Sequence, residues 1–169
     1  MEPCPGCKGL FEPREGPVHR YMTSSAACWH AYGIVLQHEY SDPRLLPTHR
    51  LSVDTYAVQH PSDGSRQAIQ SVGLHLARLM IQLESPLPPR ETNDVMLGLG
   101  RHKGTLPALT PPDRYEVTVA GVVAEAGGPR HAEAVHSWAR STWQVWAPHH
   151  PFIREWVRTT RAVGSHGGR

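Results

Sequence analysis

Beyond residue 22, apolar residues recur along most of the chain at the spacing that places them on one face of a helix. In "TSSAACWHAYGIVLQHEYSDP", residues 23–43, the positions that share one face of a helix are Cys28, Tyr32, Val35 and Glu39. Ser24 or Ser25 can cap the start of this helix, and Asp42-Pro43 is a stop signal. The pattern predicts a helix with a wide buried face.

Two further helices follow in the N-terminal half. In "THRLSVDTYAVQHP", residues 48–61, the positions on one stripe are His49, Val53, Tyr56 and His60. Thr48 can cap this helix and Pro61 ends it. In "SRQAIQSVGLHLARLMIQLES", residues 65–85, Ser65 is the cap, and a strongly apolar face runs beside His75.

The C-terminal half is less regular. Residues 85–114 contain six prolines and predict a long connection, interrupted by a short helix near residues 93–100. The valines of "YEVTVAGVVAEAGG", residues 115–128, alternate as in a strand, yet Thr118 could cap a helix that ends at Gly127-Gly128, and we favour the helix. A helix starting with Pro129 at its first position and a short helix over residues 151–162 complete the chain.

These elements predict an all-α fold, a single-domain helical bundle of five to seven helices. Residues 1–163 form the predicted domain, and residues 164–169 form a flexible tail. Residues 1–22 are rich in proline and glycine and lack periodicity, so we expect an irregular arm that something else must hold in place.

Composition narrows the class of protein. The 169 residues are 39% hydrophobic and 19% charged, which is typical of one soluble globular domain. A net charge of +2 argues against nucleic acid as a partner, and no apolar run is long enough to suggest a membrane. The N-terminal residues lack the apolar stretch of a signal peptide, and three cysteines do not suit a disulfide framework, so we expect a cytoplasmic protein.

The cysteines suggest a zinc site with an N-terminal zinc knuckle. "CPGC", residues 4–7, is a C-x2-C pattern in which proline and glycine shape a turn that aims Cys4 and Cys7 at one point. Cys28 falls in the first turn of its predicted helix, where the helix dipole favours a thiolate. The alternative for Cys28 is a small buried apolar residue without a metal.

Zinc prefers four ligands in a tetrahedron, so a fourth ligand is needed. The candidates are four histidines, His19, His30, His49 and His60. His30 points to another face of the helix than Cys28, and the choice among the rest depends on packing. We prefer His60, and a zinc site of this kind contributes on the order of 10 kcal/mol of apparent folding free energy.

A second group of polar residues suggests chemistry or packing. The predicted catalytic group is His49, Asp54, Tyr56 and His75, which we expect to line a pocket for a small polar substrate. The alternative is a buried polar network that sets the helix register. The protein is then either a zinc-binding enzyme, or a non-catalytic, zinc-stapled module that binds a protein partner.

Several strings in the chain resemble a known family. They are "CPGC", "SSAACWHAY", "HEYSDP", "HRLSVDTYAVQHP" and "SVGLHLARL", and "HSWARSTWQVWAPHHPFIREW" resembles the C-terminal part of the same family. The family is one of small bacterial proteins known only as a domain of unknown function. The resemblance therefore implies no activity, although its strings contain Cys4, Cys7, Cys28, His49, Asp54, Tyr56, His60 and His75.

Overall fold

The computed structural model describes residues 1–166 and shows an almost wholly helical protein. Within these residues the α-helices are α1 (Ala26–Ser41), α2 (His49–Gln59), α3 (Arg66–Glu84), α4 (Pro89–Arg101), α5 (Val119–Val123), α6 (His131–Val145) and α7 (His150–His166). Single-turn 3₁₀ helices are η1 (Leu46–Thr48), η2 (Lys103–Thr105) and η3 (Ala147–His149), and one antiparallel hairpin pairs β1 (Glu2–Pro3) with β2 (Leu10–Phe11). The predicted all-α bundle of five to seven helices is confirmed.

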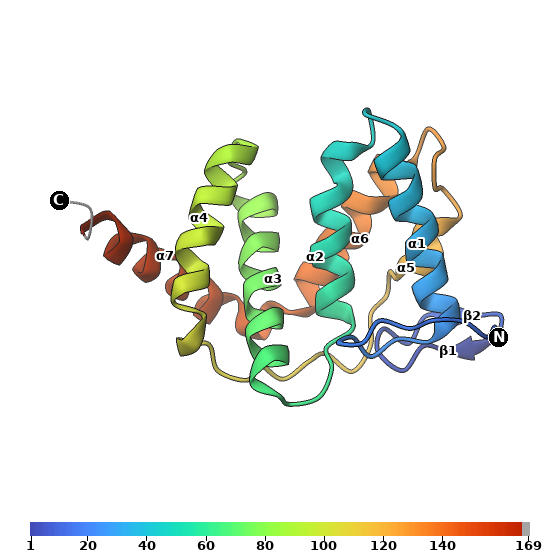
Figure 1. Ribbon diagram of the computed structural model, residues 1–169, viewed down its shortest axis with the longest axis horizontal. Helices are drawn as coiled ribbons and strands as arrows, with labels where there is room; N and C mark the ends of the chain where they lie inside the picture. Colours follow the sequence, from blue (N-terminus) through green and yellow to red (C-terminus); the bar gives the residue numbers. More distant parts are fainter. Residues whose placement is uncertain (167–169) are drawn as a thin grey trace.

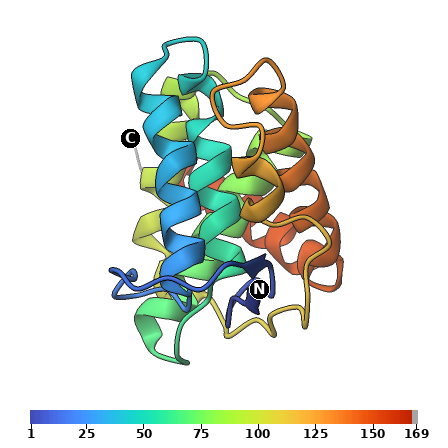
Figure 2. The ribbon, with the colours of Figure 1, turned by 90° about the vertical axis from the view of Figure 1, so that its right-hand side faces the viewer.

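The helices form two layers. Helices α1 to α4 stand side by side as an up-and-down row, α5 and α6 lie behind it, and α7 starts behind the row and runs out past α4 (Figure 1). Helix α2 is central, because it packs against α1, α3 and α6. The hairpin lies at one end of the row, beside the first turn of α1 and the last turn of α2 (Figures 1 and 2).

Local sequence signals account for the ends of the first helices. The side chain of Ser25 accepts a hydrogen bond from the backbone N–H of Cys28 at 3.2 Å, so Ser25 is the cap of α1. Ser65 caps α3 in the same way, through the N–H of Ala68 at 3.3 Å. Thr48 precedes α2, but its hydroxyl makes no capping bond there and lies instead 2.7 Å from the carbonyl oxygen of Leu45 and 3.2 Å from the carboxylate of Glu39.

The proline-rich segment contains more helix than the sequence predicts. Helix α4 begins at Pro89, four residues before the predicted short helix. Pro89 stands at the first helical position, where the missing N–H costs no hydrogen bond and the ring favours the helical backbone angle. The prolines at this end of the segment therefore start a helix, and those at positions 107, 111 and 112 follow it.

The next two helices also differ from their predicted bounds. The helix favoured over the strand for residues 115–128 is present only as the short α5, and the chain then turns to Gly127, whose φ is 74°. Helix α6 begins at His131, two residues after the predicted start at Pro129. The tail predicted for residues 164–169 overlaps the last turn of α7, and residues 167–169 lie outside the described part of the chain.

The core lies where α2, α3 and α6 meet. Its largest fully buried side chains include Trp138 and Trp146, together with Tyr56 and Leu76. The tryptophans of the C-terminal half are thus core residues. Among the described helices, none combines the length and the apolar character that crossing a bilayer requires.

Helix α3 packs closely against Leu106, the residue after η2, and a substitution at Gly73 tests how much this contact matters for stability. A Cβ at Gly73 would lie 2.8 Å from both Cδ atoms of Leu106, a side chain that is only 1% exposed. We expect Gly73→Val to lower the free energy of unfolding by about 2 kcal/mol, because the crowded core must shift. Urea denaturation followed by circular dichroism measures this loss.

The matched control is Gly33→Val on the exposed side of α1, where a Cβ meets no atom within 4 Å. This variant should stay within about 0.5 kcal/mol of the wild type. Equal losses in both variants would show that valine weakens either helix by itself and that contact with Leu106 is not the cause.

Candidate metal centre

The N-terminal hairpin places Cys4 and Cys7 in one tight turn. Glu2 pairs with Phe11 across β1 and β2, and the turn between the strands is closed by two backbone bonds. The N–H of Cys4 donates to the carbonyl of Gly9 at 2.8 Å, and the N–H of Lys8 donates to the carbonyl of Cys4 at 3.0 Å. Lys8 has a φ of 62°, so the chain reverses there and both cysteine side chains turn inward.

Antiparallel packing of α1 and α2 supplies the other two members of the site. Cys28 lies in the first turn of α1, and His60 follows the last residue of α2. Because α1 begins at the end of the bundle where α2 finishes, these two residues become neighbours although 32 positions separate them (Figure 1). The Nε2 atom of His60 lies 3.2 Å from the Sγ atom of Cys28.

The four side chains form a compact cluster. One potential ligand atom from each residue lies within 4.8 Å of the others, and the residues are Cys4, Cys7, Cys28 and His60. All four are 0% exposed, and the sulfurs of Cys7 and Cys28 are 3.9 Å apart. The structure thus brings together the residues that the sequence predicts as ligands, in a group that could hold a metal ion.

The orientation of His60 suits metal binding. Its Nδ1 atom lies 2.7 Å from the carbonyl oxygen of Tyr56, which can only accept a hydrogen bond, so Nδ1 carries the proton. In the neutral ring Nε2 then keeps its lone pair, and this is the atom that faces the sulfurs. A backbone carbonyl that orients a histidine from behind is common where histidine ligates a metal.

Aromatic rings enclose the histidine side of the cluster. The ring of Tyr56 stacks on His60 at a centroid distance of 3.9 Å and on Tyr32 at 3.9 Å from its other face. Its hydroxyl lies 3.5 Å from the sulfur of Cys28. Burial raises the pKa of Tyr56, so the hydroxyl stays protonated and can donate to a thiolate. Tyr56, predicted to be catalytic, therefore contacts the candidate metal ligands.

Electrostatics favour a cation among the sulfurs. Hydrogen bonds from Cys28 and Cys7 lower the pKa of Cys4, whereas the pKa of Cys28 is raised, first because its thiol donates to Cys4. The three thiols thus hold one negative charge readily and oppose the second and third. A bound cation would remove this opposition, because each thiolate would then face a positive charge.

Gly6 allows the hairpin to reach the bundle. A Cβ at this position would lie 2.2 Å from the carbonyl oxygen of Thr23 and 2.7 Å from a ring carbon of His60. No side chain fits in that space. The glycine of "CPGC" is therefore required for the close approach of the hairpin to the end of α2, in addition to shaping the turn.

The other histidines considered as fourth ligand lie elsewhere. The Nδ1 atom of His19 accepts from the N–H of Tyr21 at 3.1 Å, and its ring packs against Trp29. His30 is exposed. His49 stands at the opposite end of α2, where its Nδ1 atom is 3.1 Å from Glu39.

The predicted catalytic residues are distributed over three separate networks. Tyr56 belongs to the cysteine cluster, and His49 contacts Glu39 and Tyr40. Asp54 and His75 do meet, with His75 Nδ1 at 2.7 Å from Asp54 Oδ1. Asp54 is fully buried and also accepts from the guanidinium of Arg78 and the amide of Gln82. Of the predicted group, only this pair faces one another.

Glu39 is the centre of a buried polar network that we do not predict from the sequence. Its fully buried carboxylate accepts from Ser52, from Thr48 at 3.2 Å and from His131 Nε2 at 3.3 Å, besides His49. The N–H of Gly127 donates to His131 Nδ1 at 3.1 Å, which places the proton of the neutral ring on Nε2. The sequence does contain one signal for this network, which is that an acidic residue shares the otherwise apolar stripe of Cys28, Tyr32 and Val35.

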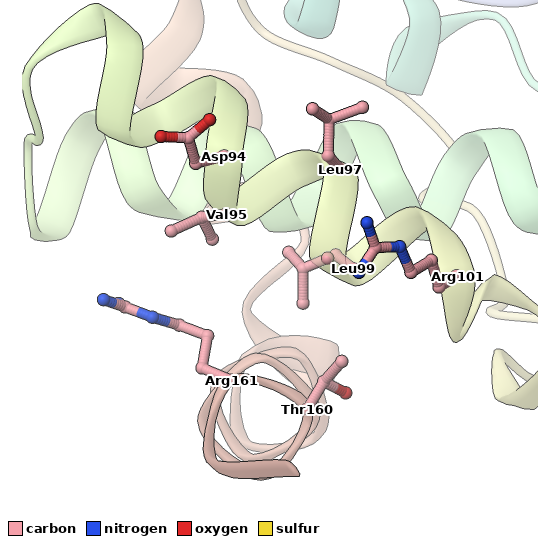
Figure 3. Close-up of a pocket in the computed structure, with 8 residues that line it drawn as sticks. Asp94, Val95, Leu97, Leu99, Arg101, Thr160 and Arg161 are labelled. Atoms are coloured by element: carbon pink, nitrogen blue, oxygen red, sulfur yellow. The ribbon is translucent and has the colours of Figure 1, made fainter. Parts of the chain in front are cut away.

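A pocket unrelated to these residues lies between α4 and α7. It has a volume of about 490 Å³, and Figure 3 shows side chains of both helices around it. Helix α4 contributes Asp94, Leu97 and Arg101, and α7 contributes Thr160 and Arg161. None of the predicted catalytic or metal-ligating residues lines it.

The chain matches a known family. Residues 2–147 match a family of unknown function, DUF5946. The chain belongs to this family. The match begins in the hairpin and ends in η3, so it includes the whole cysteine–histidine cluster and leaves α7 outside. The predicted family resemblance is confirmed, whereas no curated protein and no solved structure matches the chain.

The contribution of the Asp54 network to the stability of the fold can be measured with one substitution. Asp54→Asn keeps the size of the side chain but leaves Arg78 beside a neutral group. We expect the free energy of unfolding to fall by about 2–4 kcal/mol, because a buried ion pair loses one partner. Thermal and urea denaturation measure the change.

The matched control is Asp94→Asn, which removes the same charge from an exposed position on α4. It should change stability by about 0.5 kcal/mol at most. If Asp54→Asn were equally mild, the contacts with Arg78 and His75 would not hold α2 to α3.

Proposed function

We propose that the protein binds one zinc ion through Cys4, Cys7, Cys28 and His60. The single observation that carries this proposal is the convergence of three sulfurs and one bare imidazole nitrogen within 4.8 Å in a fully buried cluster. Three thiolates and one imidazole are a donor set typical of zinc, and magnesium or calcium would require oxygen ligands.

The zinc is structural in this proposal. Catalytic zinc sites keep a position open for water or substrate, whereas here four protein ligands would fill a tetrahedron, and all of them are buried. The ligands come from the hairpin, from α1 and from the residue after α2. An ion at this point would tie a 22-residue arm, whose only sheet is two residue pairs, to the helical bundle.

A protein-interaction role is the second candidate. Exposed apolar side chains gather on the arm that zinc would hold: Met1, Leu10, Val18 and Tyr21 are each at least 50% exposed. Apolar side chains kept at the surface of a fixed segment are suited to contact with another protein. We therefore propose that the zinc-held arm is the part of the molecule that contacts a protein partner.

The catalytic alternative has less support. An active site at His49, Asp54, Tyr56 and His75 needs these side chains around one cavity. Their contacts instead divide them among the Glu39 network, the Asp54 network and the cysteine cluster. Catalysis by this group as a whole remains a prediction, and the contacts favour a supporting role for His49 and Tyr56.

Metal content tests the zinc proposal directly. Protein purified without chelator should contain one zinc per chain by elemental analysis, and Cys4→Ser should lose it. His30→Ala is the matched control, because His30 lies two residues from Cys28 but is exposed, and this variant should keep its zinc. Absence of zinc in the wild type, or its retention in Cys4→Ser, would contradict the proposal.

Cobalt substitution tests whether the site is closed. Cobalt-loaded protein should show the intense visible absorption of tetrahedral cobalt with thiolate ligands. Adding cyanide or azide should leave that spectrum unchanged, because all four positions are occupied by the protein. A shift on addition of either anion would reveal an open position and would favour a catalytic metal.

Photo-crosslinking tests the interaction role. A photoreactive amino acid placed at Val18 should capture a recurrent partner in cells, and the capture should be lost when Cys4→Ser is added. The control position is Leu46 in η1, which is similarly exposed at 49% but lies away from the arm. Equal capture at both positions, or capture that survives Cys4→Ser, would contradict a zinc-held docking surface.

A further inference from the structure

A pocket of about 320 Å³ opens between α3, α4 and η2, away from the cysteine cluster. This volume is at the lower end of the range for small-molecule sites. His75 and Arg78 from α3 and Lys103 from η2 line it, and so do the apolar side chains of Leu74 and Met96. None of the residues that line the pocket belongs to the proposed zinc site, so ligand binding here does not require zinc chemistry.

The buried carboxylate of Asp54 sets the orientation of His75. Asp54 is 0% exposed, and its Oδ1 atom lies 2.7 Å from His75 Nδ1. A carboxylate accepts, so Nδ1 donates and Nε2 is the ring nitrogen that Asp54 does not engage. Within residues 1–166 we find no protein partner for Nε2. A ring held in this way can exchange a proton with a bound molecule through Nε2.

Arg78 is held by the same carboxylate. Its Nε and one terminal nitrogen donate to Asp54 at 2.6 to 2.8 Å. The second terminal nitrogen, Nη1, has no acceptor in the described part of the chain. Asp54 therefore orients two side chains at once and leaves each with one nitrogen that has no protein partner, and both residues line the pocket.

The charged side chains that line the pocket are all basic. Its basic lining residues are Lys103, which is exposed, and Arg78, and no aspartate or glutamate lines it. Asp54 offsets much of the charge of Arg78, so Lys103 is the main source of positive potential. Ser71 and Gln70 add hydroxyl and amide groups at the wall.

We propose that this pocket binds a small phosphate monoester. The ammonium of Lys103 and Nη1 of Arg78 would contact the phosphate oxygens. Nε2 of His75 accepts the O–H of a singly protonated phosphate, or donates when the ring itself carries the proton. Leu74 and Met96 would contact the organic part of the molecule. His75 is a ligand-contacting residue in this proposal, and Asp54 is a positioning residue.

Binding of phenyl phosphate by the full-length, metal-loaded protein tests the proposal. Ring nitrogen signals of 15N-labelled histidine are recorded during titration, and His75→Gln identifies the His75 signals. We expect saturable shifts of the His75 signals with phenyl phosphate, smaller ones with inorganic phosphate and none with neutral benzyl alcohol. Absence of saturable shifts at His75 with both phosphate probes overturns the proposal.

Charge variants provide the second measurement. Lys103→Gln should weaken phenyl phosphate binding about tenfold or more by calorimetry, since about 1.4 kcal/mol of interaction corresponds to that factor. Arg101→Gln removes the same charge two residues earlier, from a side chain that lines the α4–α7 pocket instead, and should leave the affinity within about twofold. Equal weakening by both variants would show general attraction to a basic surface and overturn the site.

The variant His75→Gln tests whether His75 contacts the ligand without changing the fold of the protein. It should weaken phenyl phosphate binding while the amide spectrum of the remaining protein stays that of the wild type. If this variant loses its fold, Lys103→Gln and Arg101→Gln still decide the question, because both residues are exposed. Unchanged affinity in a folded His75→Gln protein would remove His75 from the site and contradict the proposal.

Discussion

The antiparallel packing of α1 and α2 is the constraint on which the rest of the N-terminal structure depends. It brings the first turn of α1 beside the last turn of α2, so that Cys28 and His60 come within 3.2 Å. The arm adds two more sulfurs to that pair, and the residue that follows the arm, Thr23, donates its backbone N–H to the carbonyl of His60. A hairpin of two residue pairs has little stability of its own. Its position therefore follows from the cluster at the end of the two helices and from the close approach that Gly6 permits.

Helix α2 explains why the same stretch of sequence suggests catalysis. It is central, so polar side chains on several of its faces become buried and need partners. His49 meets Glu39 near its start, Asp54 meets Arg78 and His75 in its middle, and Tyr56 meets Cys28 near its end. Each network joins α2 to a neighbouring helix. His49 and Tyr56 share a stripe and both contact α1, but at opposite ends of the helix, whereas Asp54 lies off that stripe and contacts α3.

The sequence predicts the three cysteines of the candidate metal centre more directly than it predicts the histidine. Cys4 and Cys7 follow from the C-x2-C turn, and Cys28 follows from its place after the cap Ser25. His60 and His49 were both candidates because they share a stripe of one helix, and only the direction of α2 relative to α1 separates them. The pairing of Glu39 with His131 spans 92 positions and has no local signal. The pocket at His75 likewise depends on α4 and η2, which fall in the proline-rich segment where the sequence predicts mainly a connection.

The sequence by itself determined the helical class, the starts of α1 and α3, and the cysteines of the candidate metal centre. These features arise from interactions within a few residues, such as a serine capping the third N–H beyond it or a period of 3.6 residues. The tertiary structure alone decided which histidine joins the sulfurs, which networks share the polar residues of α2 and where a pocket opens. Those outcomes depend on contacts between segments that lie 21 to 92 positions apart, and they exist only after the helices have packed in one arrangement.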